Sequence, residues 1–259
     1  MSLVTSERQD RVATITLNRP EVLNALSGSM ADELTGSFEE VARDPDSWVV
    51  ILRAAGEKAF CVGADLKERG RFSLDDFHTN RKQVKGMFAA LRAIPQPTIA
   101  SIFGPALGGG FELALSCDLI IAARDAKVGL PEVRVGLLPA GGGTQLLTRK
   151  LGTTRAKDLI FRGRIVDAEH AWELGLVAEL CERAELDAHT SKIASDIARS
   201  SSPVAVRAAK RAIDGALGVP IDEGIEIEHA AWAEVIASED RAEGIAAFNE
   251  KRGPNWQNR

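Results

Sequence analysis

The chain has 259 residues, of which 45% are hydrophobic and 27% are charged, as in ordinary globular domains. This length is enough for one large domain or for a domain with an appendage. The net charge of −5 argues against a nucleic-acid or anionic-membrane partner, because such proteins usually carry basic stripes. No apolar run approaches the roughly 18 residues of a membrane helix, and the N-terminus does not resemble a signal peptide. We therefore expect a soluble, cytoplasmic protein.

The cysteines and histidines give no sign of a disulfide framework or a metal site. The three cysteines, Cys61, Cys117 and Cys181, are odd in number and widely spaced. We interpret each as a small buried hydrophobic residue. The four histidines show no paired ligand spacing, so we expect no metal.

The first ninety residues alternate between strand and helix patterns. Residues 11–18 are rich in β-branched side chains and lead into Pro20, which predicts a strand that enters a turn. Apolar residues then recur at helical spacing from residue 27 until Asp44 and Pro45 end the pattern. Residues 48–54 form a continuous apolar run, typical of a strand buried on both faces.

A glycine at the end of the next apolar run is followed by a charged segment. The run AFCV ends at Gly63, and residues 64–67 read Ala-Asp-Leu-Lys. This pattern fits either a backbone that a ligand can approach closely or an ordinary strand-to-helix turn. Ser73 and Asp76 then resemble a capping box, which predicts a helix that ends before Pro95.

The central stretch, residues 104–132, combines glycines with two carboxylates. A strand ending at Phe103 is followed by the triplet 108–110, which leads into a helical run. The first amides of a helix have no internal partner and attract negative charge. Glu112 lies in this first turn, and Glu132 follows another strand, twenty positions later. The stretch is therefore a candidate acid/base site with an oxyanion hole, although close packing and helix-dipole complementarity also explain these residues.

A second glycine triplet, residues 141–143, also precedes a helical run. Gln145 follows Thr144, so the pattern lacks the lysine of a phosphate-binding loop. A tight turn and close helix packing explain these glycines better. Beyond residue 200 the patterns are helical only, and Ser238 with Asp240 is predicted to cap the last helix. Large apolar residues on these helices indicate either core or a subunit interface.

Five motifs in this order resemble the crotonase (enoyl-CoA hydratase/isomerase) superfamily over essentially the whole chain. They are LNRPEVLNAL, AFCVGADLKE, GPALGGGFELALSCD, KVGLPEVRVGLLPAGGGTQ and DRAEGIAAFNEKR. The resemblance implies an α/β fold, a spiral of ββα units over residues 1–199 that carries the active site. It also implies a helical trimerisation segment over residues 200–259.

The resemblance assigns roles to four residues. The amides of Ala64 and Gly109 would polarise the thioester carbonyl, on which negative charge grows as an enolate forms. Glu112 would activate water, and Glu132 would donate a proton to Cα. Isomerase-like members commonly keep only one of these carboxylates, and members that rely on a catalytic tyrosine are disfavoured because this chain has none. The implied enzyme is an enoyl-CoA hydratase, a hydro-lyase of fatty acid β-oxidation.

The resemblance also indicates where coenzyme A would bind. It points to residues 64–67, that is Ala64, Asp65, Leu66 and Lys67, together with Gly109 and with Phe248 and Lys251 of a neighbouring subunit. Coenzyme A belongs to the substrate, so no separate cofactor is expected. The expected assembly is a homotrimer or a homohexamer built as a dimer of trimers, without nucleic acid or membrane.

The residues leave the acyl group open. A straight-chain enoyl-CoA is the first expectation. The segment DLKER, residues 65–69, also resembles methylglutaconyl-CoA hydratases of leucine degradation, in which Arg69 would pair with a second substrate carboxylate. A solvent-exposed Arg69 is the expectation that follows from the charged run alone. A non-catalytic crotonase-fold protein that acts as a scaffold or binds RNA is a third reading, which the intact carboxylate pair and the acidic charge disfavour.

Overall fold

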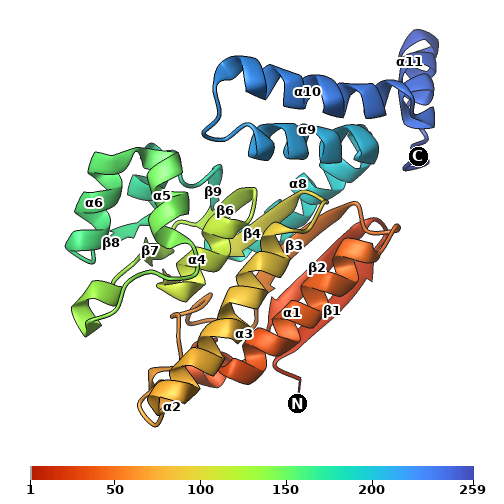
Figure 1. The fold of residues 1–259 in the computed structure, drawn as a ribbon. Coiled ribbons are helices and arrows are strands. Elements are labelled where there is room, and N and C mark those ends of the chain that lie inside the picture. The colour runs from red at the N-terminus through yellow and green to blue at the C-terminus, as the bar shows by residue number, and fades with distance from the viewer. Residues whose placement is uncertain (1) are drawn as a thin grey trace.

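The computed structural model describes residues 2–259, and its centre is a six-stranded sheet (Figure 1). The strand order is β1-β2-β3-β4-β6-β9; β1 and β2 form an antiparallel hairpin, and the other neighbouring strands are parallel. The strands are β1 (Val4–Gln9), β2 (Val12–Leu17), β3 (Val49–Ala54), β4 (Thr98–Ile102), β6 (Leu119–Ala123) and β9 (Glu179–Cys181).

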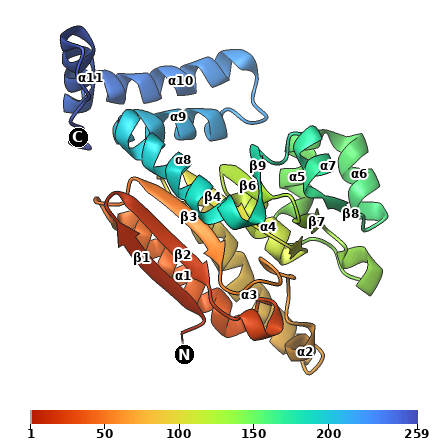
Figure 2. The same cartoon turned by 180° about the vertical axis from the view of Figure 1, so that it is seen from behind.

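Both faces of this sheet are buried, which explains the continuous apolar run at residues 48–54. Val50 and Leu52 of β3 pack beneath α1 (Gly28–Arg43) and α3 (Leu74–Arg92). Val49 and Ile51 point to the opposite face, where α8 (Leu186–Ser200) lies across the sheet (Figure 2). Side chains of a strand alternate between faces, so a strand covered on both sides must be apolar throughout.

The predicted helix boundaries of the first half are confirmed. The Ser27 side chain accepts a hydrogen bond from the amide of Met30 at the start of α1, and Asp44 follows its last residue. Ser73 and Asp76 form the predicted capping box at the start of α3. Both caps satisfy amides that the first helical turn leaves without a partner.

The structure differs from the sequence-based expectation in two strand regions. Strand β1 was not predicted. Only Val4 of its six residues is buried, and an edge strand with polar side chains lacks the apolar alternation that identifies a strand. In the segment AFCV, residues 59–61 are buried and Val62 is partly buried, but the segment is not a regular strand. It pairs only through an isolated bridge between Cys61 and Ala106. All three cysteines are buried and free, as predicted.

A smaller sheet and a group of short helices follow the central strands. Its strands are β5 (Pro105–Leu107), β7 (Lys127–Gly129) and β8 (Ile165–Asp167), in that order. The accompanying helices are α2 (Leu66–Arg69), α4 (Gly109–Ser116), α5 (Gly143–Leu151), α6 (Thr153–Phe161) and α7 (Ala168–Glu173). Three short 3-10 helices complete the connections: η1 (Pro20–Val22), η2 (Glu132–Val135) and η3 (Arg183–Glu185).

The regular elements after residue 200 are helices only, as predicted, and they project from the sheet, whereas residues 251–259 form a tail without helix (Figure 1). Helix α9 (Pro203–Gly215) lies along α10 (Ile221–Ile236), and α11 (Glu239–Glu250) stands at the far end. Ser238 caps α11, but Asp240 does not share this role. The fully buried Asp240 carboxylate instead accepts hydrogen bonds from the amides of Gln257 and Asn258, which fixes the C-terminal tail.

Among the described residues, no helix has the length and apolar character required to cross a bilayer.

The close approach of α4 to the segment around Cys61 depends on Gly110. A Cβ atom at residue 110 would lie 2.1 Å from the Cys61 carbonyl oxygen, whereas one at Gly36 of α1 would meet nothing within 4 Å. We expect Gly110→Ala to destabilise the protein by about 1–3 kcal/mol through overpacking. The control Gly36→Ala should stabilise it by about 0.5–1 kcal/mol. Thermal unfolding midpoints at one protein concentration test this, and an unchanged midpoint for Gly110→Ala would contradict it.

Candidate active site

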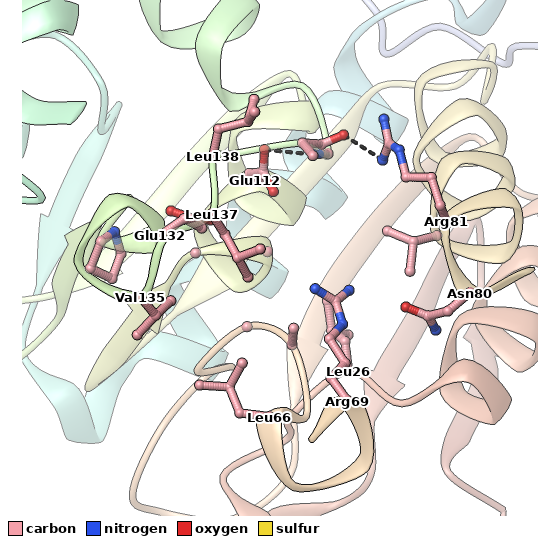
Figure 3. A pocket seen from close by; sticks show the side chains of 18 of the residues that line it. Leu26, Leu66, Arg69, Asn80, Arg81, Glu112, Glu132, Val135, Leu137 and Leu138 are labelled. Carbon is pink, nitrogen blue, oxygen red and sulfur yellow. Dashed lines mark hydrogen bonds between the residues drawn. The ribbon is translucent and has the colours of Figure 1, made fainter. Parts of the chain in front are cut away.

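A cavity of about 470 Å³ lies where the predicted glycines and carboxylates meet (Figure 3). Its walls come from α2 and α3 on one side, and from the start of α4 and the loop of residues 131–141 on the other. Most of the lining is apolar. Such a cavity, with a few convergent polar groups, is the usual form of a small-molecule site.

Glu112 enters this cavity from the first turn of α4. Its side chain is only 3% exposed, and its Oε1 atom accepts hydrogen bonds of 2.7 Å from the amides of both Gly141 and Gly143. A Cβ atom at residue 141 would lie 2.7 Å from Glu112 Oε2 and 2.2 Å from the ring of Phe88. The second glycine triplet therefore permits close packing, as predicted, but it also supplies the donors for Glu112. That second role was not predicted.

Two arginines of α3 hold the loop that carries these amides. Arg81 donates a hydrogen bond of 2.7 Å to the carbonyl of Ala140, and Arg92 donates one of 3.2 Å to the carbonyl of Gly141. The carbonyls face α3 while the neighbouring amides face Glu112. The partners are 59 positions apart in the first contact and 49 positions apart in the second, so local sequence patterns do not reveal either contact.

Glu132 reaches the same cavity from η2, and its surroundings differ from those of Glu112. Its Oε1 atom lies 3.0 Å from the position of a Cβ at Gly108, so a side chain there would displace it. The Oε2 atom is buried and has no hydrogen-bond partner among residues 2–259. Glu112 thus has two amide donors, whereas one carboxylate oxygen of Glu132 has no hydrogen-bond donor.

Burial raises the pKa of both carboxyl groups. For Glu132, burial and, to a smaller extent, the nearby charge of Glu112 outweigh the opposing influence of its own backbone amide and of Arg69, and they bring the pKa to about 7. Burial also raises the pKa of Glu112, but the amides of residues 141 and 143 stabilise its ionised form and oppose the shift. We infer that Glu112 ionises first and that Glu132 holds its proton at neutral pH.

Ala64 and Gly109 line the same cavity as the two carboxylates. A Cβ at Gly63 would come within 3.1 Å of the Gly109 nitrogen, so the two strand-to-helix junctions are in close contact. Gly63 has a φ of +87°, which favours glycine. Within residues 2–259, neither amide donates a hydrogen bond. The structure therefore brings together all four residues that were predicted to be catalytic.

Only some of the residues predicted to bind coenzyme A line the cavity. Leu66 lines the cavity, but the side chains of Asp65 and Lys67 do not. Asp65 caps α2 by accepting from the amides of Lys67 and Glu68, and it pairs with Arg19 at 2.8 Å. Phe248, which is 83% exposed, lies on α11, and Lys251 follows that helix, away from the cavity (Figure 1). Their predicted contact requires a second subunit.

Arg69 is not the exposed residue that the charged run indicates. It lines the cavity, and its Nε atom is buried. The one-turn helix α2 directs it inward while Lys67 points to solvent. Asn80 of α3, whose side chain is 4% exposed, lines the same wall and was not predicted.

A family model described as enoyl-CoA hydratase/isomerase matches residues 7–259. The protein belongs to this family. A crystal structure of an enoyl-CoA hydratase from Bacillus anthracis is 40% identical and covers both chains fully, with a TM-score of 0.97. The mouse mitochondrial enoyl-CoA hydratase domain-containing protein 2 is 42% identical over 95% of this chain and 84% of its own. The mouse mitochondrial methylglutaconyl-CoA hydratase is 37% identical over 97% of this chain and 81% of its own.

These similarities confirm the predicted superfamily and fold. The chain is an enzyme of the enoyl-CoA hydratase/isomerase family, with the α/β crotonase fold and a helical C-terminal segment. The family membership does not by itself assign a reaction to each residue of the cavity, because one fold supports several chemistries.

The raised pKa of Glu132 predicts an effect on stability. The folded protein holds this proton more tightly than the unfolded chain, so stability falls as the pH rises from the ordinary value of 4.5 to about 7. The glutamine of Glu132→Gln cannot ionise. We therefore expect the free energy of unfolding of this variant, relative to that of the wild type, to be about 2–3 kcal/mol higher at pH 8 than at pH 4. The exposed control Glu39→Gln should show no such change. Unfolding midpoints across this pH range measure it, and a constant difference for Glu132→Gln would contradict it.

Proposed function

We propose that the protein hydrates trans-2-enoyl-CoA thioesters to 3-hydroxyacyl-CoA. The observation that carries this proposal is the pair Glu112 and Glu132, which share one cavity in different surroundings beside two free amides. Addition of water to an α,β-double bond needs a base for water and an acid for Cα. Two carboxyl groups with separated protonation states supply both.

The proposed mechanism begins with the thioester carbonyl oxygen between the amides of Ala64 and Gly109. Glu112 takes a proton from water as the water oxygen bonds to Cβ, and the π electrons move towards the carbonyl as an enolate. The two amides stabilise the negative charge on the carbonyl oxygen. Glu132 then donates its proton to Cα. Proton transfer from Glu112 back to Glu132 after product release restores the starting state.

The substrate supplies the coenzyme A, so the reaction needs no separate cofactor. We propose that residues 64–67 and Gly109 contact the thioester end of coenzyme A through their backbone. Phe248 and Lys251 would contact it from a neighbouring subunit. We retain the cytoplasm as the proposed location.

We also propose a homo-oligomer built from trimers. Several large apolar residues of the helical segment have no cover within the chain, including Ile213, Ile221 and Trp232, which are 66%, 77% and 59% exposed. Burial of such residues between subunits would remove this apolar surface from water. The same association would bring Phe248 and Lys251 towards a neighbouring cavity.

Two acyl classes share this reaction. Straight-chain substrates would place the enzyme in fatty acid β-oxidation, and methylglutaconyl-CoA would place it in leucine degradation. Arg69 in the cavity favours a substrate of the second kind. An RNA-binding role has no comparable support, because the chain is acidic.

The hydratase proposal predicts that both carboxylates are needed for turnover of crotonyl-CoA. Glu112→Gln and Glu132→Gln should each lower kcat by about 10²–10⁴-fold, because one proton transfer is lost, with little change in KM. The control Glu39→Gln should leave both constants unchanged. In the wild type, kcat/KM should fall above pH 7 as Glu132 loses its proton. Loss of the enoyl-thioester absorbance measures the rate, and near-normal kcat in Glu132→Gln would refute its role.

The proposed assembly predicts a trimer or hexamer in sedimentation velocity at micromolar concentration. Trp232→Glu should shift the protein towards monomer, because a charge buried in an apolar interface is strongly unfavourable. Leu74→Glu, at a residue that is 73% exposed on α3, is the matched control and should leave the assembly intact. A monomeric wild type would contradict the proposal.

A further inference from the structure

The turn of residues 19–26 contains two consecutive non-glycine residues in the left-handed backbone region. Leu23 has a φ of +58° and Asn24 a φ of +55°. Residues with a side chain rarely adopt this conformation, and asparagine tolerates it better than leucine. The Leu23 side chain is 36% exposed, so its burial offers little compensation. Such a strained pair persists only where the surrounding structure holds it, and strain of this kind is concentrated at functional sites.

The Asn24 side chain holds this turn in place. It is 1% exposed, and its Oδ1 atom accepts a hydrogen bond of 2.8 Å from the amide of Arg19. Its Nδ2 atom donates to the carbonyls of Ala55 and Ala59, at 3.0 Å and 3.1 Å. Ala59 begins the segment AFCV, which leads into Gly63. One buried amide therefore closes the turn and fastens it to the segment that leads to the cavity.

Leu26, two positions after Asn24, pairs with the backbone on both sides of Ala64. Its amide donates a hydrogen bond of 2.7 Å to the Gly63 carbonyl, and its carbonyl accepts one of 3.0 Å from the Asp65 amide. This parallel bridge fixes the two peptide groups that flank Ala64.

The first of these hydrogen bonds sets the orientation of the Ala64 amide. In a trans peptide group, the carbonyl and the N–H point in opposite directions. The Gly63 carbonyl points to the Leu26 amide, so the N–H of the same peptide group, which belongs to Ala64, points away from it. Within residues 2–259 this N–H has no acceptor, and both Gly63 and Ala64 line the cavity. The contact with Leu26 therefore fixes the direction of a donor that is free for a ligand.

The other free amide of the cavity, that of Gly109, is held in a different way. The carbonyl of the same peptide group belongs to Gly108, and it accepts a hydrogen bond of 2.9 Å from the amide of Glu112. This bond belongs to the first turn of α4. A helix thus orients the Gly109 donor, whereas the Ala64 donor depends on the strained turn of residues 19–26.

Arg19 adds a second connection between the two segments. Its Nη1 atom donates to the Ala25 carbonyl at 3.1 Å and to Asp65 Oδ2 at 2.8 Å. The side chains of Arg19 and Asp65 are only 21% and 11% exposed. Ala25 precedes Leu26 and Asp65 follows Ala64, so Arg19 joins the residues that flank the bridge.

We propose that Asn24 and Arg19 are positioning residues of the oxyanion hole, which act on the Ala64 amide through Leu26. Neither side chain lines the cavity, so neither acts by touching the substrate. The inference rests on the proposed hydratase function, in which the Ala64 amide stabilises negative charge on the thioester carbonyl oxygen. Because this charge grows in the transition state, a misdirected amide lowers turnover more than substrate binding.

A kinetic experiment with crotonyl-CoA tests this role. Asn24→Gly keeps access to the left-handed backbone region but removes the side-chain hydrogen bonds to residues 19, 55 and 59. We expect kcat to fall about 10–100-fold with little change in KM, because a small misplacement of one donor has this effect. The decrease of kcat/KM above pH 7 should stay at the same pH, because Glu132 is unchanged. Normal kcat in a folded Asn24→Gly would overturn the inference.

Gln96→Ala is the matched control for the loss of a buried amide. Gln96 is 3% exposed and donates to the carbonyls of Val41 and Ser47, but it does not line the cavity. This variant should unfold at a lower temperature and keep the wild-type kcat. An equal loss of kcat in Gln96→Ala and Asn24→Gly would assign the effect to general destabilisation and contradict the positioning role.

Arg19→Gln tests the same role through a side chain that is less buried. It removes the contacts with Ala25 and Asp65 but leaves the Asn24 side chain in place. We expect a lower kcat with little change in KM, and a smaller effect than that of Asn24→Gly. This variant keeps the inference testable if Asn24→Gly does not fold, and a normal kcat in Arg19→Gln would then refute it.

Infrared difference spectroscopy examines the amide separately from hydration. Butyryl-CoA has no double bond to hydrate, and an isotope label at its thioester carbonyl identifies the carbonyl stretching band. Hydrogen bonds to a carbonyl lower this frequency, so binding to the wild type should lower it. The shift should be smaller in Asn24→Gly and Arg19→Gln and complete in Gln96→Ala. An equal shift in all four proteins would overturn the inference.

The two proposals fail in different ways. A wild type that hydrates crotonyl-CoA, with normal kcat and a complete infrared shift in Asn24→Gly and Arg19→Gln, would refute the positioning role and leave the hydratase function intact. A wild type that lowers the carbonyl frequency of butyryl-CoA through these residues but hydrates no enoyl-CoA would refute the hydratase function and support the positioning role.

Discussion

The buried carboxylate of Glu112 imposes the constraint on which the rest of the site depends. A carboxylate that is 3% exposed must find donors within the protein, and the amides of Gly141 and Gly143 are those donors. The loop must therefore come close to α4. This approach is possible only because residue 141 has no side chain, and the arginines of α3 hold the loop carbonyls from the other side. One buried charge thus links α3, α4 and the start of α5.

The same constraint separates the roles of the two carboxyl groups. The amide donors favour the charged form of Glu112, whereas the buried Oε2 of Glu132 has no donor and favours the protonated form. Two identical side chains thus differ in acidity because different elements carry them. A pair that differs in this way can act as base and acid in successive proton transfers.

The sequence predicts the parts of this site that depend on local patterns. The triplet at residues 108–110 lies between a strand and a helix, so the position of Glu112 in the first helical turn follows directly. The partners of Glu112 do not follow, because they come from a loop about 30 positions away. A glycine triplet is compatible with a tight turn whether or not its amides bind a carboxylate. Strand β1 was missed for a related reason, since its pairing with β2 leaves most of its side chains exposed.

The orientation of Arg69 was predictable from neither composition nor periodicity. Helix α2 has four residues, too few for an apolar stripe to show which side faces the interior. The inward direction results from the cap at Asp65, whose carboxylate is fixed by Arg19 and by the amides of Lys67 and Glu68. A substitution that disturbs this cap would therefore move Arg69 and the part of the cavity wall that α2 forms.

The two carboxyl groups of the cavity and its polar residues Arg69 and Asn80 lie on different walls. Glu112 and Glu132 belong to α4 and η2, and Arg69 and Asn80 belong to α2 and α3. Sequence identity over the whole chain includes the residues of both walls. By this measure the chain is similarly close to an enoyl-CoA hydratase, at 40%, and to a methylglutaconyl-CoA hydratase, at 37%. A percentage over the whole chain therefore does not separate the two substrate classes, because residues beside the carboxyl groups and residues of the opposite wall count alike.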